Sequence, residues 1–262
     1  MPDRLLDILV TNLEIDNSEV YRVEGPLSLV RLRHLCKLDR PDLKDAPFTP
    51  APLKAASGDE DIFSIIRRGD SLLHQPFDSF QPVVDFLRTA ARDPNVLAIK
   101  MTLYRVGRNA PVVEALLEAN ENGKQVAVLV ELKARFDEES NIEWARALEK
   151  EGVHVVYGLI GMKVHSKVAM VVRREGSVMR RYVHLATGNY NAVTAHLYTD
   201  LGFFTCDEEI GGDCSDLFNY ITGYSAKSDY RKLLGATINL RKRFEQMIGR
   251  EIEHAKAGRA GQ

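Results

Sequence analysis

Strand-like and helix-like runs alternate along the middle of this chain, and the alternation limits the folds open to it. Nearly continuous apolar runs, as found in buried parallel strands, occupy residues 96–102, 125–131 and 154–157. Helices are predicted between them, over residues 111–122 and 141–150. Because parallel neighbours need a crossover connection, the pattern predicts an α/β domain with a mostly parallel sheet flanked by helices. Functional groups are expected at the carboxyl ends of its strands.

Flanking segments add elements to this unit. Strands are predicted over residues 166–172 and 181–186, joined by a polar hairpin loop at 173–177, and they make the sheet mixed through an antiparallel edge or extension. A helix over residues 79–91 begins at a capping serine, and His74 before it is assigned to a helix-entry turn. From about residue 230 the chain predicts a charged helix with one apolar face, formed by Leu240, Phe244, Met247, Ile248 and Ile252.

The composition favours one main domain in a reducing compartment. The 262 residues are 45% hydrophobic, enough for one core, and a net charge of -2 argues against a nucleic-acid partner. Cys36, Cys206 and Cys214 show neither metal-ligand spacing nor a disulfide framework, which indicates a cytoplasmic protein. No run is apolar and long enough to span a bilayer, and the N-terminus does not resemble a signal peptide. Membrane association would therefore be peripheral.

Two short segments can carry chemistry, residues 161–167 (GMKVHSK) and 187–191 (TGNYN). His165 and Lys167 form an H-x-K pair entering a predicted strand, with both side chains expected on one side of it and open to solvent. A neutral imidazole is a nucleophile at cellular pH, and a neighbouring ammonium would bind phosphate. The second segment supplies donors, Asn189 among them, that would orient the imidazole and bind phosphoryl oxygens.

An H-x-K pair followed by G-N-x-N resembles the phospholipase D superfamily. The usual motif of that superfamily continues as H-x-K-x-x-x-x-D, and Val172 stands in the place of the aspartate. In this departure the chain resembles the polyphosphate kinase branch of the superfamily, and the resemblance extends over most of its length. The segments that carry this resemblance are 21–27 (YRVEGPL), 74–80 (HQPFDSF), 100–105 (KMTLYR), 131–138 (ELKARFDE) and 197–200 (LYTD).

The resemblance implies reversible, ATP-dependent elongation of polyphosphate. His165 would take the γ-phosphoryl group of ATP as a phosphohistidine and pass it to the polyphosphate chain, with Lys167 and Asn189 completing the catalytic group. Tyr198 matches a tyrosine beside the nucleotide. Lys163 would contact phosphate, which follows from its place in the first segment.

Two arginines match the family's Mg²⁺ and phosphate site. Arg105 and Arg135 each follow a predicted strand, the expected place for substrate contacts. A guanidinium has five donors and no acceptor, so each arginine is expected to bind phosphate oxygens, with Mg²⁺ bridging nearby. Neither is expected to ligate the metal directly.

The resemblance also implies that the chain is part of a longer enzyme. Residues 1–52 would be the end of a preceding domain and its linker. Residues 53–230 would form the phospholipase D-like catalytic domain, and residues 231–262 would start the next one. The complete enzyme would be a homo-oligomer, and this chain alone is expected to be inactive or impaired.

Two other functions remain open for these residues. The first is a phosphodiesterase or nuclease of the phospholipase D type, working as a homodimer, against which Val172 weighs. The second is a non-catalytic module that binds polyphosphate through Arg105, Arg135, Lys163 and Lys167, with strongly salt-dependent affinity. His154 and His184 lie in predicted strands without a motif and are interpreted as structural. The acidic run 137–139 is interpreted as the first turn of a helix.

Overall fold

The computed structural model describes residues 1–53, 60–107, 110–134, 137–158, 161–223 and 229–260. The chain divides into two units, Met1–Phe48 and Thr49–Gln262. The first contains helix α1 (Asp3–Leu13) and the 3-10 turns η1 (Asn17–Glu19), η2 (Leu29–Lys37) and η3 (Pro41–Leu43). None of these elements has a buried residue, so this unit has no core of its own.

The second unit is built on a seven-stranded sheet whose described strands have the order β1-β7-β6-β5-β2-β3-β4. Strands β2 (Val96–Leu103), β3 (Gln125–Val130) and β4 (His154–Tyr157) are parallel neighbours. Helices α4 (Pro111–Glu121) and α5 (Glu138–Lys150) connect them, which confirms the predicted βαβαβ unit. Glu138 and Glu139 lie in the first turn of α5, as expected from the acidic run.

The sheet is mixed, but the prediction that it is mostly parallel is wrong. Strands β5 (Lys167–Glu175) and β6 (Val178–Ala186) form an antiparallel hairpin in the middle of the sheet, with β5 beside β2, and not at an edge. Strands β7 (Asp200–Thr205) and β1 (Ser71–Gln75) extend the sheet, again antiparallel. After β4, the connections to β5, β6 and β7 each reverse the chain direction.

Four described helices and strands of the second unit lie outside the predicted pattern: α2 (Ile62–Arg68), β1, β7 and α6 (Glu208–Ile221). His74 belongs to β1, so its assignment to a helix-entry turn is wrong. The short strand was hidden because Ser71 and Gln75, both polar, take buried positions in it. The helix expected before β2 is α3 (Gln81–Arg92), and the Ser79 hydroxyl accepts a hydrogen bond from the Gln81 backbone at 3.1 Å.

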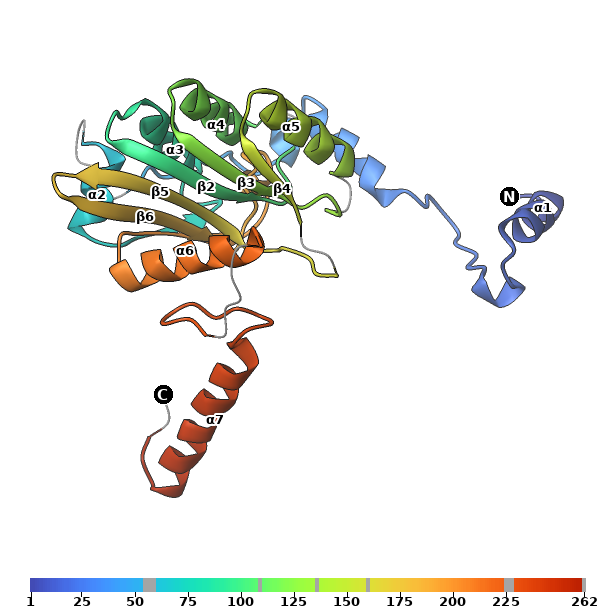
Figure 1. Cartoon of the computed structure of the whole chain (residues 1–262). Coiled ribbons are helices and arrows are strands. Elements are labelled where there is room, and N and C mark those ends of the chain that lie inside the picture. The colour runs from blue at the N-terminus through green and yellow to red at the C-terminus, as the bar shows by residue number, and fades with distance from the viewer. Residues whose placement is uncertain (54–59, 108–109, 135–136, 159–160, 224–228, 261–262) are drawn as a thin grey trace. The chain divides into compact units, whose positions relative to one another are not determined.

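Helices cover both faces of the sheet (Figure 1). Helices α3, α4 and α5 lie over one face and α6 lies over the other. The larger core, on the first face, contains an aromatic group in which ring centroids of successive neighbours are 4.8 to 5.8 Å apart. Its members are Phe63, Phe86, Tyr182 and Phe204. The smaller core lies under α6 and includes Val164, Val168, Met170, Val183, Cys214 and Phe218.

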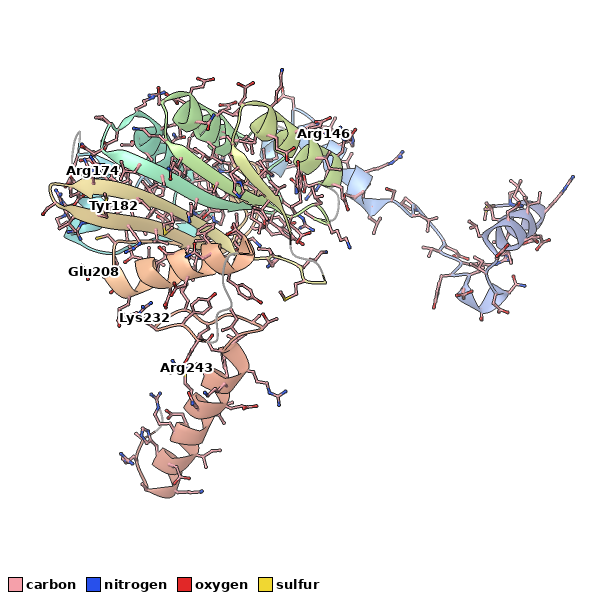
Figure 2. All side chains as sticks on the ribbon, viewed as in Figure 1. Arg146, Arg174, Tyr182, Glu208, Lys232 and Arg243 are labelled. Carbon is pink, nitrogen blue, oxygen red and sulfur yellow. The ribbon has the colours of Figure 1, made fainter. Side chains whose placement is uncertain are left out.

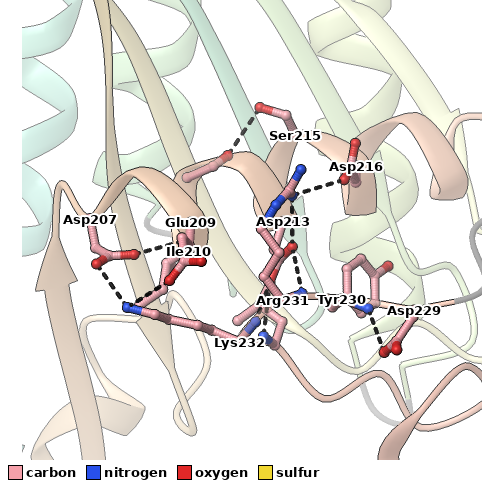
Figure 3. Close-up of polar contacts among 12 residues, drawn as sticks. Asp207, Glu209, Ile210, Asp213, Ser215, Asp216, Asp229, Tyr230, Arg231 and Lys232 are labelled. Carbon is pink, nitrogen blue, oxygen red and sulfur yellow. Dashed lines mark hydrogen bonds and ion pairs between the residues drawn. The ribbon is translucent and has the colours of Figure 1, made fainter.

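Asp213 on α6 holds the segment that returns to this helix (Figure 3). Its buried carboxylate accepts hydrogen bonds from the backbone N–H groups of Arg231, Lys232 and Leu233 at 2.7 to 3.0 Å. The Arg231 side chain adds a bond at 3.2 Å. Burial alone would raise the pKa of Asp213, but these bonds outweigh burial and hold the pKa below its usual range. Residues 231–233 are thereby fixed against α6.

Glu175 organises the hairpin end of β5 and β6, where Tyr182 and Arg174 are seen in Figure 2. Its carboxylate accepts hydrogen bonds from Arg173 at 2.9 Å, from Arg180 at 2.8 Å and from the Tyr182 hydroxyl. Burial opposes ionisation of Glu175, but the hydrogen bonds from Tyr182, Arg180 and Arg173 outweigh burial and lower its pKa to about 2.

The charged helix expected near the end of the chain is α7 (Leu240–Lys256). None of its residues is buried, and the side chains of its predicted apolar face Phe244, Met247, Ile248 and Ile252 are exposed. Among the described residues, no helix combines the length and the apolar character needed to cross a membrane.

Phe86→Ala tests the larger core. Phe86 is fully buried, and its ring centroid lies 5.8 Å from that of Phe63 and 5.4 Å from that of Phe204. The substitution should lower the free energy of unfolding by about 3–5 kcal/mol in chemical denaturation. Phe244→Ala, at a half-exposed position of α7, is the matched control and should cost less than about 1 kcal/mol. Equal losses would contradict this assignment of the core.

Glu175→Gln tests the hairpin cluster through pH. The pKa of Glu175 is about 2 in the fold, against an ordinary value of 4.5. The ionised carboxylate therefore stabilises the fold fully above its unfolded pKa, and this stabilisation is lost as the pH falls through the folded pKa. At pH 7 the variant should lose about 2–3 kcal/mol of unfolding free energy, and progressively less at lower pH. Glu253→Gln on exposed α7 is the control. A loss for Glu175→Gln that does not change with pH would contradict the assignment.

Candidate active site

His165 lies where strand β2 ends and strand β5 begins. Strand β5 runs antiparallel to β2 with Ala169 opposite Met101, so the loop before β5 adjoins the carboxyl end of β2. The imidazole of His165 is exposed, whereas Val164 before it is buried in the smaller core. The nucleophile predicted from the H-x-K motif is therefore presented at the expected end of the parallel strands.

Tyr104, directly after β2, packs against both residues of the H-x-K pair. Its ring meets the His165 imidazole edge to face, with centroids 4.6 Å apart. The Lys167 amine lies 4.6 Å from the same ring centroid, and the Arg105 guanidinium carbon lies 5.6 Å from it. Both cations are within the range of cation–π attraction. One aromatic ring thus holds the imidazole and two positive charges together.

His165 is kept in its neutral form. Partial burial and the positive charges of Lys167, Arg105 and Lys163 lower its pKa below the ordinary value of 6.5. Each effect disfavours the imidazolium, so an unprotonated ring nitrogen is available at neutral pH. That is the state required of a nucleophile.

Lys167 is buried, so the prediction that both H-x-K side chains are open to solvent is wrong. Lys167 is only 4% exposed, because the ring of Tyr104 packs against its amine. That amine donates a hydrogen bond to the His165 carbonyl oxygen at 2.7 Å. Burial and the charge of Arg105 lower the pKa of Lys167 to about 8, while Asp200 acts in the opposite direction. The described hydrogen bond of the Lys167 amine is therefore to the backbone of His165.

Arg105 and Lys163 complete the group of cations. Lys163 is exposed, and Arg105 lies in the loop after β2 with its Nε 3.8 Å from Asp137 Oδ2. Among the described residues, the Arg105 Nε is buried without a hydrogen-bond partner. Arg135, predicted to share the role of Arg105, lies outside the described residues. The two described cations could donate to an anion beside His165.

The residues around His165 do not form a cage for a bare metal ion. In the described ranges, no group of three or more His, Cys, Asp or Glu side chains is placed to hold a metal. Arginine and lysine have donors and no acceptor, so they cannot be ligands. A metal ion here would need other ligands, such as the oxygens of a bound phosphate and of water.

The T-G-N-Y-N segment is packed closely against two neighbouring loops. A Cβ on Gly188 would lie 2.6 Å from the Asp200 carboxylate, which also accepts a hydrogen bond from Thr187 at 2.9 Å. A Cβ on Gly107, in the loop after β2, would lie 2.8 Å from Asn191 Nδ2. Glycine is therefore required at both positions. The loops after β2 and β6 meet through these contacts.

Asn189 and Tyr198 are not brought against the imidazole by any hydrogen bond that the described residues contain. Within the described part of the chain, the Asn189 Oδ1 is buried without a hydrogen-bond partner, and Asn189 and His184 both line a small cavity of about 10 Å³. Burial lowers the pKa of His184 to about 3, so that ring is neutral. Tyr198 is 61% exposed, just beyond the turn η4 (Thr194–His196). Their predicted roles remain predictions.

An apolar hollow of about 510 Å³ opens beside His165. Its walls include Val164, Leu185, Leu217, Ile221 and Leu233, together with Lys163 and Lys167. The imidazole thus stands between a cationic group and an apolar surface on the α6 side.

Several residues that shape the site were not predicted from the sequence. Tyr104 and Glu131 lie in segments similar to the family, and the sequence assigns neither a role, although each directly follows a buried strand. That position was the available signal, because side chains there face the carboxyl edge of the sheet. Thr102 and Asp200 also lie in similar segments, 100–105 and 197–200. Their roles were not predictable, because their contacts are with residues of other strands and loops.

The mixed sheet, with H-x-K before its central strand β5 and G-N-x-N after β6, defines a phospholipase D-like α/β domain. Val172, in the place of that superfamily's aspartate, lies in β5 and packs against the smaller core. Residues 61–227 match the family model for polyphosphate kinase C-terminal domain 1. The chain belongs to the polyphosphate kinase family.

Relatives and a solved structure agree with this family. The chain is 56% identical over 260 residues to polyphosphate kinase of Prosthecochloris aestuarii, covering 98% of this chain and 36% of that protein. It is 55% identical over 261 residues to polyphosphate kinase 1 of Chlorobaculum tepidum, covering 100% of this chain and 37% of that protein. The crystal structure of polyphosphate kinase from Porphyromonas gingivalis matches with a TM-score of 0.82 at 32% identity, over 98% of this chain and 40% of that one. The chain therefore spans little more than a third of the curated relatives' length.

The electrostatics of the site can be tested by titrating His165. Its ring resonances in NMR should show a midpoint below 6.5. Arg105→Gln removes one neighbouring positive charge, which should raise the midpoint. Arg88→Gln, at an exposed position of α3, is the control and should leave the midpoint unchanged. A midpoint at or above 6.5 in the unaltered chain would contradict the described environment.

Proposed function

We propose that this chain carries the phosphoryl-accepting part of a polyphosphate kinase. The observation that carries the proposal is the exposed imidazole of His165, kept neutral beside Arg105, Lys163 and Lys167. A neutral nucleophile surrounded by cations suits an attack on an anionic phosphate, because the cations offset repulsion and developing charge. Family membership supports the γ-phosphate of ATP and the end of polyphosphate as the two phosphoryl donors.

The proposed reaction has two reversible steps. A ring nitrogen of His165 attacks the γ-phosphorus of ATP; the N–P bond forms, the bond from that phosphorus to the bridging oxygen breaks, and ADP leaves with the electron pair. A terminal oxygen of polyphosphate then attacks the phosphohistidine and the N–P bond breaks. The polyphosphate grows by one phosphate and the imidazole returns to its neutral form.

Arg105 and Lys163 would bind the phosphate oxygens in these steps, together with Arg135. Mg²⁺ would enter as the ATP complex and neutralise the phosphates. Tyr198 would contact the nucleotide and Asn189 would donate to a phosphoryl oxygen. The complete enzyme would be a homo-oligomer located in the cytoplasm.

The chain alone would be a slow or inactive kinase. Its relatives are nearly three times as long, and binding energy from distant parts of a substrate contributes to the rate of the chemical step. A small phosphoryl donor that needs no nucleotide site would bypass this requirement. Such a donor can therefore test His165 itself in this chain.

Labelling with inorganic phosphoramidate tests the proposed nucleophile. His165 should take up acid-labile, base-stable phosphate about tenfold faster than exposed His154, because cations surround His165. Peptide mapping by mass spectrometry measures both sites in one molecule. His165→Ala should abolish the fast label, whereas His154→Ala should leave it. Uptake at His165 no faster than at His154 would contradict the proposal.

A parallel assay with γ-labelled ATP and Mg²⁺ measures the kinase reaction. Label at His165 should form much more slowly than in the full-length Chlorobaculum tepidum relative, and chelation of Mg²⁺ should prevent it. Metal-independent hydrolysis of a phosphodiester reporter, lost in His165→Ala, would instead favour the phospholipase D-type alternative. Salt-dependent binding of polyphosphate without any label would favour the non-catalytic module.

A further inference from the structure

The backbone on both sides of His165 is held by side chains. The Val164 N–H donates to Glu131 Oε2 at 2.9 Å, and the Ser166 carbonyl accepts from the Thr102 hydroxyl at 2.8 Å. Lys167 holds the carbonyl of His165 itself. The backbone of residues 164–166, a loop without regular structure, is thus held by three side-chain hydrogen bonds, while the imidazole stays exposed.

Glu131 is placed for this contact by the end of β3. Its own N–H continues the parallel ladder by donating to the Leu103 carbonyl at 2.9 Å. The carboxylate is buried, with the residue 4% exposed, and its other oxygen accepts from the Lys133 N–H at 2.9 Å. Buried carboxylates are costly unless hydrogen bonded, so losing either donor would leave one buried carboxylate oxygen without its described partner. This makes the link to Val164 a strong constraint on the loop.

Thr102 makes the corresponding contact from β2. It is 2% exposed, and its hydroxyl both donates to the Ser166 carbonyl and accepts from the Val168 N–H at 3.0 Å. The hydroxyl therefore bridges the first residues of β5 to β2, next to the point where the main-chain ladder between these strands begins. An apolar group of the same shape would fill the space but leave both backbone groups unpaired.

We infer that Glu131 and Thr102 are positioning residues for His165, an inference that rests on the proposed function of His165 as the phosphoryl acceptor. Neither side chain is exposed to a substrate, and each acts through the backbone next to the nucleophile. Together they set the distance of the imidazole from Tyr104 and from the cations. Small displacements of a reacting group cost up to about a hundredfold in rate, so the loss of either contact should be visible in the chemistry.

The experiment compares four variants with the unaltered chain by two readouts. Thr102→Val removes the hydroxyl, Thr102→Ser keeps it, and Glu131→Gln removes one of two accepting oxygens. Thr205→Val is the matched control, because Thr205 is fully buried and its hydroxyl accepts the Asp207 N–H at 3.0 Å, at the start of α6. The readouts are the ratio of phosphoramidate label at His165 to that at His154, and the NMR titration midpoint of His165.

Thr102→Val and Glu131→Gln should lower the labelling ratio by about tenfold and move the His165 midpoint upward toward its ordinary value. Thr102→Ser should retain the ratio to within about threefold. Thr205→Val should lower the free energy of unfolding yet change neither readout, which separates positioning from stability. Variants are compared under conditions where circular dichroism shows them folded.

Two other outcomes overturn the inference in different ways. A normal ratio and midpoint in folded Thr102→Val and Glu131→Gln, beside a selectively labelled unaltered chain, would show that these residues do not position His165. If the unaltered chain shows no preference for His165, the proposed function fails and the inference falls with it.

Discussion

One buried amide joins the carboxyl ends of the two central parallel strands, and the site is built on that junction. Asn141, which is fully buried on α5, donates from Nδ2 to the Tyr104 carbonyl at 2.7 Å and to the Glu131 carbonyl at 2.9 Å. Parallel strands that end inside a protein leave carbonyls that need donors. Because one amide serves both, the residues after β2 and after β3 are held at a fixed separation. The indole N–H of Trp144, from the same helix, donates to the Gly107 carbonyl at 2.8 Å and so holds the loop after β2 against α5.

The charge at the site is local and is not apparent from the net charge of the chain, which is -2. Arg105, Lys163 and Lys167 all act on His165, and the acids near them, Asp137 and Asp200, offset them only in part. Holding like charges together costs free energy, which an anion bound among them would recover. Burial and these positive charges together lower the pKa of His165, so the field that attracts an anion also disfavours the imidazolium.

The sequence predicted what depends on local pattern and missed what depends on pairing across the chain. The βαβαβ unit was predictable because long apolar runs at helix and strand periods mark buried parallel strands. The central position of the β5–β6 hairpin was not, since its partner β2 lies far back along the chain. His165, Lys163 and Arg105 were predictable from motif and strand ends. The burial of Lys167 and the roles of Tyr104, Glu131 and Thr102 were not, because they arise from contacts between strands distant in sequence.

Lys163 and Lys167, the two lysines of the segment 161–167, have different surroundings, which follow from opposing demands on the nucleophile. The proposed reaction brings two anionic partners to one imidazole in turn, so the ring has to remain accessible. A side chain that is open on one side cannot be fixed by packing around its own ring, and its position must come from the backbone behind it. Lys167 serves that backbone: it is buried, has a lowered pKa and is bonded to the His165 carbonyl. Lys163 is exposed, so of these two lysines it is the one whose amine can contact a bound phosphate.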